Sequence, residues 1–140
     1  MRNIFTLSAY ETDAEHFFNL LMKENTDLVL DVRLKNSSQL CGFTKEKDLA
    51  YLIPKITNAI YVHDLRFAPS SALLESYLKH AVNWEIYSSS FIKEMKEKDA
   101  AALFEDSYEK YQSICILGTA TKNRRSHSEV LEKMFSAKSK

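Results

Sequence analysis

Residues 27–33 read DLVLDVR, an apolar run that begins and ends with charged residues. A strand buried on both faces has a nearly continuous apolar sequence, whereas a strand with one wet face alternates apolar and polar residues. The run therefore predicts a central strand of a parallel sheet. Helices cover both faces of such a sheet, so this segment favours an α/β protein.

Segments on both sides of this run alternate between strand-like and helix-like patterns. Further strands are expected at residues 3–8 (NIFTLS), 59–63 (AIYVH) and 113–118 (SICILG). The expected helices begin near Thr12, Thr44, Pro69, Asn83, Ala101 and Ser126, and three of these residues are expected to cap their helices: Thr12, Thr44 and Asn83. This alternation predicts a three-layer α/β/α sandwich with a mostly parallel sheet of about four strands. The strand order stays open.

The composition is that of an ordinary soluble domain, expected to span residues 1–140 as one unit: 45% of the residues are hydrophobic and 27% are charged. Lys plus Arg equals Asp plus Glu at 19 each, so nucleic-acid binding is disfavoured, although the basic C-terminal segment keeps it open. The sequence has no apolar span long enough for a membrane and no Cys-x-x-Cys pair. We therefore expect a cytoplasmic protein with no membrane partner.

Polar and ionisable residues follow each predicted strand at its carboxyl end. They are Ser8 and Tyr10, Asp31 and Arg33, His63, and the run from Gly118 to Thr121. Ligands of open parallel sheets bind outside the carboxyl ends of the strands. The sequence therefore predicts a ligand site at this edge.

Asp31 and Arg33 are the most informative of these residues. They are two positions apart, so both side chains lie on the same side of the strand. A carboxylate in an apolar strand needs a partner, and a structural ion pair with Arg33 would provide one. Alternatively, Arg33 could clamp a phosphate or carboxylate group of a ligand. His63 could serve as a base near neutral pH or as a hydrogen-bonded structural residue.

The last loop and helix also suggest an anion site. Ser126 and Glu129 have the spacing of a capping box, and His127 falls on the apolar face of the helix. Three basic residues precede this helix: Lys122, Arg124 and Arg125. Together with the unpaired N–H groups at a helix N-terminus, they favour binding of an anion.

Several stretches carry a family resemblance: FTLSAYETDAEHFFNLL, LVLDVRLKNSSQLCGFTKEKDLAYLI, AIYVHDLRFAPSSALL, NWEIYSSSFIKEM and the final strand-loop-helix. With them the chain resembles the bacterial domain-of-unknown-function 488 family over nearly its full length. The resemblance implies a Rossmann-like fold and a pocket formed by Asp31, Arg33 and the last loop.

The sequence departs from the family pattern at three places. Ser8 stands where a glycine is expected, and Ala120 stands about where the family has a glutamate. The family's Cys-His-Arg corresponds here to residues 126–128, Ser-His-Ser, so only His127 matches. A cysteine at a helix N-terminus would be an acidic nucleophile, whereas a serine there would need an adjacent base. The resemblance therefore implies a site that has lost any thiol-based catalysis.

Three functional hypotheses follow. The first is binding of a small anionic ligand, such as a nucleotide, at the carboxyl edge. Its expected contacts are Ser8, Tyr10, Arg33, Lys45, His63, Thr119, Arg125 and Ser126. The second is a hydrolase or transferase with a histidine base, His127 or His63, oriented by Asp31. The third is a protein or nucleic-acid interaction module, and self-association also stays open. No cofactor and no metal site are predicted.

Overall fold

A four-stranded, all-parallel sheet forms the centre of the molecule. The computed structural model describes residues 2–139. The strands are β1 (Asn3–Ser8), β2 (Leu28–Asp31), β3 (Ile60–His63) and β4 (Ser113–Gly118), in the order β1-β4-β2-β3. The predicted three-layer α/β/α sandwich with a parallel sheet is confirmed.

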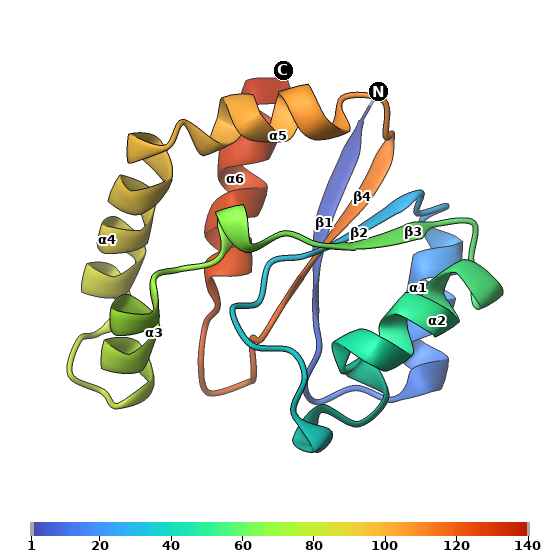
Figure 1. The fold of residues 1–140 in the computed structure, drawn as a ribbon, viewed down its shortest axis with the longest axis horizontal. Helices are drawn as coiled ribbons and strands as arrows, with labels where there is room; N and C mark the ends of the chain where they lie inside the picture. The colour runs from blue at the N-terminus through green and yellow to red at the C-terminus, as the bar shows by residue number, and fades with distance from the viewer. Residues whose placement is uncertain (1, 140) are drawn as a thin grey trace.

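Helices cover both faces of the sheet (Figure 1). One face carries α1 (Ala14–Lys23) and α2 (Glu46–Ile56). The other face carries α3 (Ser71–Leu78), α4 (Trp84–Glu97), α5 (Ala100–Tyr108) and α6 (His127–Ser139). Two 3-10 segments, η1 (Gln39–Thr44) and η2 (Leu65–Phe67), follow β2 and β3. Within residues 2–139, no helix has both the length and the apolar character needed to cross a membrane.

The burial of the strands explains their order. Every residue of β2 and of β4 is buried, whereas β1 and β3 are partly exposed along their length. The two strands with continuous apolar sequences therefore occupy the centre, and the two mixed strands form the edges. Successive side chains of β2 enter different cores: Leu28 and Leu30 pack toward α4–α6, and Val29 packs toward α1 and α2.

Helix starts were predicted only in part. Asn83 caps α4 as expected, because its Oδ1 accepts a hydrogen bond from the Ile86 amide at 2.9 Å. The expectation that Thr12 caps α1 is wrong, since the Asp13 carboxylate accepts from the His16 amide instead. Asp13 is one residue after Thr12, so the error concerns the identity of the cap and not the existence of the helix.

The second and third helices also differ at their starts. Thr44 does not cap α2: its hydroxyl lies 2.7 Å from the Cys41 carbonyl and 3.1 Å from the Ala9 carbonyl, and α2 begins after Lys45. Pro69 precedes the third helix, but Ser70 is the residue that caps it. Thr44 instead links η1 to the end of β1.

Gly118, the last residue of β4, allows the start of α6 to pack against the sheet. A Cβ atom at this position would lie 2.3 Å from Ser128 Oγ and 2.8 Å from Ser126 Oγ. Both serines are buried. Only glycine therefore fits here without displacing the first turn of the helix.

We expect Gly118→Ala to lower the free energy of unfolding by about 1–3 kcal/mol, because the added methyl group must push a buried helix start away from β4. Urea unfolding measures this difference. Gly42→Ala separates backbone strain from packing: its Cβ meets no atom within 4 Å, so any loss of stability there comes from the strain of an alanine at a φ of +61°. An unchanged unfolding midpoint for Gly118→Ala would contradict the close packing.

Candidate functional site

The loops that leave the carboxyl ends of the strands meet at one edge of the sheet. The Ala9 amide donates to the Gly118 carbonyl at 2.9 Å, which joins the ends of β1 and β4. The Val32 amide donates to the Leu117 carbonyl at 3.2 Å, which joins the ends of β2 and β4. The residues predicted from the strand ends therefore do lie along a common edge.

Asp31 and Arg33 form a buried, two-point ion pair. Arg33 Nε donates to Asp31 Oδ1 at 2.9 Å, and Arg33 Nη2 donates to Asp31 Oδ2 at 2.7 Å. The side chains are 0% and 1% exposed. Asp31 and Arg33 thus bond to each other on one side of the strand. They form the structural ion pair that was one of the two predicted alternatives.

The carboxylate of Asp31 accepts three further hydrogen bonds. They come from the Arg33 amide (3.1 Å), Asn36 Nδ2 (3.1 Å) and the Tyr61 hydroxyl (2.5 Å). Burial by itself would raise the pKa of Asp31. The hydrogen bonds and positive charge of Arg33, together with the hydrogen bonds from Tyr61 and Asn36, hold the pKa below its usual range. Asp31 is therefore an ionised and fully bonded group, poorly suited to accept a proton.

Arg33 is bonded to the protein on several sides. Its Nη2 donates to the Thr44 carbonyl at 2.6 Å, and its Nη1 lies 3.9 Å from Cys41 Sγ. The guanidinium thus connects β2 with η1 and the start of α2. Because it is buried and internally bonded, it does not present itself to a ligand in this structure.

Two other predicted contact residues are also held inside this region. His63 Nε2 donates to the Arg33 carbonyl at 2.8 Å, and its Nδ1 lies 3.4 Å from Glu46 Oε2. Lys45 Nζ bonds to Asp48 Oδ2 at 2.5 Å. These contacts order the chain between β2 and α2 and leave less of each side chain for a ligand.

His127 lies on the other side of the sheet from the carboxylate of Asp31. Its Nε2 donates to the Val32 carbonyl at 2.7 Å, and its ring packs edge-on against Phe91 of α4 at 5.1 Å. Asp31 instead faces Tyr61 on the side of α1 and α2. The pair of His127 with Asp31 in the second hypothesis is therefore not formed, and His63 Nε2 bonds to the Arg33 carbonyl and not to Asp31.

Burial lowers the pKa of His127 to about 4, more strongly than its bond to the Val32 carbonyl and the charge of Asp31 raise it. The imidazole is consequently neutral at physiological pH, with its proton on Nε2. His127 does not add a positive charge to the helix N-terminus.

Ser126 caps α6 without completing the predicted capping box. Its Oγ accepts from the Thr119 amide at 3.2 Å and lies 3.4 Å from the Ser128 amide. The Glu129 carboxylate turns away and binds Arg125. Among the described residues, no hydrogen bond joins the Ser126 hydroxyl to a histidine. This arrangement fits a structural serine that also holds the Thr119 backbone in place.

Ser8 fixes the loop that follows β4. Its hydroxyl donates to the Ala120 carbonyl at 2.5 Å and accepts from the Tyr10 amide at 3.0 Å. Next in this loop, Thr121 and Arg124 exchange backbone hydrogen bonds of 2.9 and 3.2 Å, which close a tight turn. The basic segment is therefore an ordered turn at the carboxyl edge.

The two arginines of this turn differ in their surroundings. Arg125 binds Glu129 at 2.7 and 2.9 Å and lies over the Trp84 ring, 4.4 Å from its centroid. The Arg124 side chain makes no hydrogen bond or ion pair with any residue the structure describes. The Tyr77 hydroxyl of α3 donates to the Arg125 carbonyl at 2.9 Å, which places the segment after the turn beside α3.

A pocket of about 370 Å³ opens at the carboxyl edge between the segment after Arg33 and α3. Its lining residues are Leu34, Lys35, Ser71, Leu74, Glu75, Leu78 and Lys79. None of the predicted contact residues lines it. Arg125 instead lines a pocket of about 200 Å³ between α4 and α6. In residues 2–139, no cluster of His, Cys, Asp and Glu is arranged to hold a metal ion.

Sequence reasoning missed Asn36, Tyr61 and the Thr44 carbonyl, which complete the Asp31–Arg33 network. The signal for Tyr61 was indirect: it lies on β3, which pairs with β2, and its ring shares the face of Asp31. Asn36 and Thr44 belong to an irregular loop, where no periodicity identifies the inward-facing residues.

We expect Asp31→Asn to lower the free energy of unfolding by about 3–5 kcal/mol, because the guanidinium of Arg33 then stays buried without an ionised partner. Chemical denaturation at neutral pH measures the loss. Glu75→Gln is the control, since it removes an exposed ion pair with Lys79 and should change stability by about 1 kcal/mol or less. Similar small losses in both variants would argue against the buried pair.

The pKa of His127 makes stability depend on pH. Between the unfolded pKa of about 6.5 and the folded value of about 4, the unfolded chain binds one more proton, so stability falls as the pH decreases through this window. We expect His127→Gln to reduce the slope of stability against pH by up to about 1.4 kcal/mol per unit.

Urea midpoints measured between pH 7.5 and 4.5 test this expectation. The control is His80→Asn, because His80 is exposed and asparagine tolerates its φ of 62°. An unchanged slope in His127→Gln would mean that His127 is not buried in its neutral form.

The comparisons with known proteins give a family and no activity. No curated protein and no solved structure matches the chain. The family model described as "Domain of unknown function DUF488" matches residues 13–135, which include the buried ion pair, His63, His127, the final turn and the first part of α6. The chain therefore belongs to the DUF488 family.

Proposed function

We propose that the protein binds a small anionic ligand, such as a nucleotide or another phosphate compound, at the carboxyl edge of the sheet beside α6. One observation carries the proposal: Arg124 extends from an ordered turn at this edge and has no ion-pair partner among the described residues. A guanidinium that has no ion-pair partner and whose backbone is fixed in a turn is a good group for binding a phosphate.

The backbone of the turn supports this role. Ser8 holds the Ala120 carbonyl, and the Glu11 carboxylate accepts from the Lys122 amide at 2.7 Å. These bonds fix the loop before a ligand binds, which reduces the ordering entropy lost on binding. The positive end of the α6 dipole lies directly after the turn and favours an anion.

The charges around the turn identify Arg124 and Lys122 as the main cations. Arg125 is neutralised by Glu129, and His127 is uncharged. Arg33 was the expected clamp, but its guanidinium is bonded to Asp31 and Thr44. The proposal therefore keeps the predicted ligand class and moves the principal contact from Arg33 to Arg124.

The proposal concerns binding and not turnover. Asp31 accepts hydrogen bonds on both oxygens, and the Ser126 hydroxyl accepts backbone amides. His127 gives its proton to a backbone carbonyl. None of these three groups has the pairing that general-base or nucleophilic catalysis requires.

A thermal-shift titration with inorganic phosphate, pyrophosphate, AMP and ATP tests the proposal. We expect at least one of them to raise Tm of the wild-type protein, and Arg124→Gln to weaken the effect about tenfold or more, because a charged hydrogen bond is lost. The affinity should also fall as salt increases.

Lys96→Gln is the matched control, since it removes an exposed positive charge on α4, away from the turn. It should leave the shift unchanged. Equal shifts in wild type and Arg124→Gln, or no shift with any of the four compounds, would contradict the proposal. A response only to DNA or RNA would favour the interaction-module alternative.

A further inference from the structure

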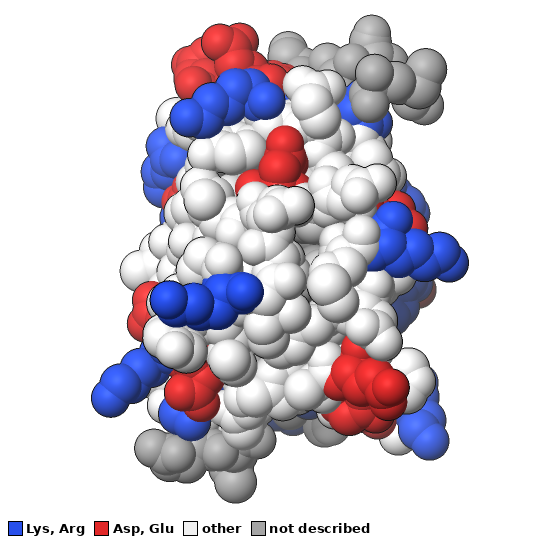
Figure 2. All heavy atoms as spheres, turned by 90° about the vertical axis from the view of Figure 1, so that its right-hand side faces the viewer, with Lys and Arg blue, Asp and Glu red and all other residues white. Residues whose placement is uncertain are grey.

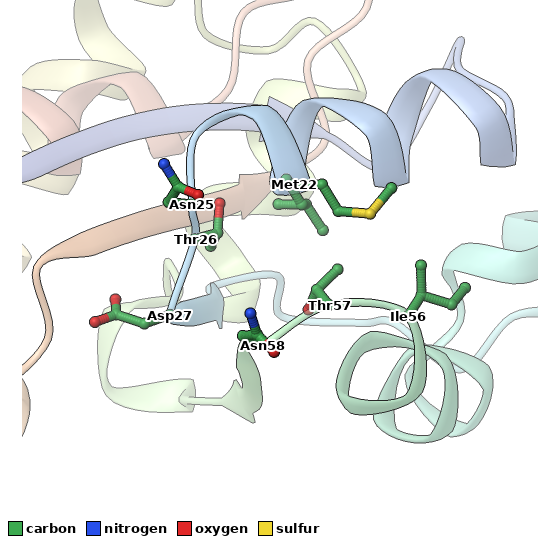
Figure 3. A pocket seen from close by; sticks show the side chains of 8 residues that line it. Met22, Asn25, Thr26, Asp27, Ile56, Thr57 and Asn58 are labelled. Carbon is green, nitrogen blue, oxygen red and sulfur yellow. The ribbon is translucent and has the colours of Figure 1, made fainter.

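Another cavity lies at the opposite, amino edge of the sheet. It has a volume of about 210 Å³ and lies between the C-terminal ends of α1 and α2, beside the starts of β2 and β3. Figure 3 shows Asn25, Thr26 and Asp27 on one side and Thr57 and Ile56 on the other. The volume is below the roughly 300–1,000 Å³ of pockets that enclose drug-sized ligands, so it suits a single small molecule.

The wall of this cavity contains a polar group without a partner. Thr26 is only 2% exposed, and its hydroxyl makes no hydrogen bond to any described residue. Buried hydroxyls are nearly always hydrogen-bonded, because an unpaired one destabilises the fold. An exception at the wall of a pocket indicates a group whose partner is a bound molecule.

Two amide side chains at the rim are also unused. Asn25 and Asn58 are exposed, and neither side-chain amide bonds to a residue the structure describes. The remaining polar groups are occupied: both Asp27 oxygens accept backbone amides of residues 112 and 113, and the Thr57 hydroxyl donates to the Ile53 carbonyl. The cavity therefore offers one hydroxyl and two amides, each able to donate and accept.

The other walls are apolar and carry no positive charge. Met22 and Ile56 are 45% and 41% exposed, which is high for large apolar side chains, and Leu21 forms part of the lining. No Lys, Arg or His lines the cavity. The surface that carries α1 and α2 is also largely uncharged at its centre (Figure 2). A phosphate or carboxylate ligand would find no counter-charge here.

From these observations we infer that the amino-edge cavity binds a small, uncharged, planar molecule with a hydrogen-bonding edge, of the chemical class of a nucleobase or an aromatic amide. Its flat faces contact Met22 and Ile56, and its polar edge bonds to Thr26 and to the amides of Asn25 and Asn58. This site is separate from the anion site, because the two lie at opposite ends of the strands.

The Thr26 hydroxyl is nearly inaccessible to solvent before a ligand binds. A rotation of about 120° about χ1 moves it to another staggered position, and the exposed Met22 side chain is free to shift with the ligand. In the proposed site, this rotation turns the hydroxyl toward the ligand.

Titrations of the ¹⁵N-labelled protein with adenine, uracil and benzamide, followed by amide chemical shifts, test the inference. We expect at least one compound to give saturable shifts confined to residues near 21–27 and 56–60. Thr26→Val keeps the shape of the side chain and removes the hydroxyl, so it should weaken binding at least tenfold. Its Tm without ligand should equal or exceed that of wild type, because the unpaired group is gone.

Asn58→Ala provides a second test at an exposed position that does not affect folding, and it should also weaken binding. Asn123→Ala, at the carboxyl edge, should bind the compound as wild type does. The inference is wrong if none of the three compounds shifts these amides, or if Thr26→Val binds as tightly as wild type. A lower Tm in Thr26→Val together with unchanged shifts would show that the hydroxyl serves the fold alone.

Discussion

The buried ion pair between Asp31 and Arg33 is the constraint on which the carboxyl edge of the sheet depends. A charge removed from water must be matched by a partner and by hydrogen bonds, or it destabilises the fold. Here the carboxylate accepts five hydrogen bonds, and the guanidinium reaches the Thr44 carbonyl beyond them. The network fixes the long connection between β2 and α2, which contains little regular structure of its own.

The backbone of this segment, at Val32 and Arg33, also positions the two histidines that were predicted as possible bases. The Val32 carbonyl accepts His127 Nε2 from the side of α6, and the Arg33 carbonyl accepts His63 Nε2 from β3. Each imidazole therefore donates a hydrogen bond to a backbone carbonyl that follows the end of β2. The convergence of ionisable residues at this edge, which suggested catalysis, is in large part the means by which a strand end satisfies its backbone and its charges.

The sequence was most informative where burial alone decides the outcome. Continuous apolar runs identified β2 and β4, and their burial on both faces places them at the centre of the sheet. The helix caps were harder to predict. Thr12 and Asp13 are both good capping residues, and only the path of the chain selects Asp13.

The site was harder to predict because it depends on contacts between distant segments. That Arg33 binds Asp31 and not a ligand depends on Thr44, Asn36 and Tyr61, which reach it only through the β2–β3 pairing and the folded loop. Periodicity places a side chain on a face, but it does not reveal which distant residue completes its hydrogen bonds.

In the last loop, the departure from the family pattern that the resemblance implies can be explained by close packing against Gly118. Where the resemblance places Cys-His-Arg, this chain has two small serines around His127, and both approach Gly118 closely. Ser128 is buried, so an arginine there would have to leave this contact or displace the helix. His127 pairs the Val32 carbonyl. With the serines packed against β4, the cation of the proposed site comes from the preceding turn, at Arg124.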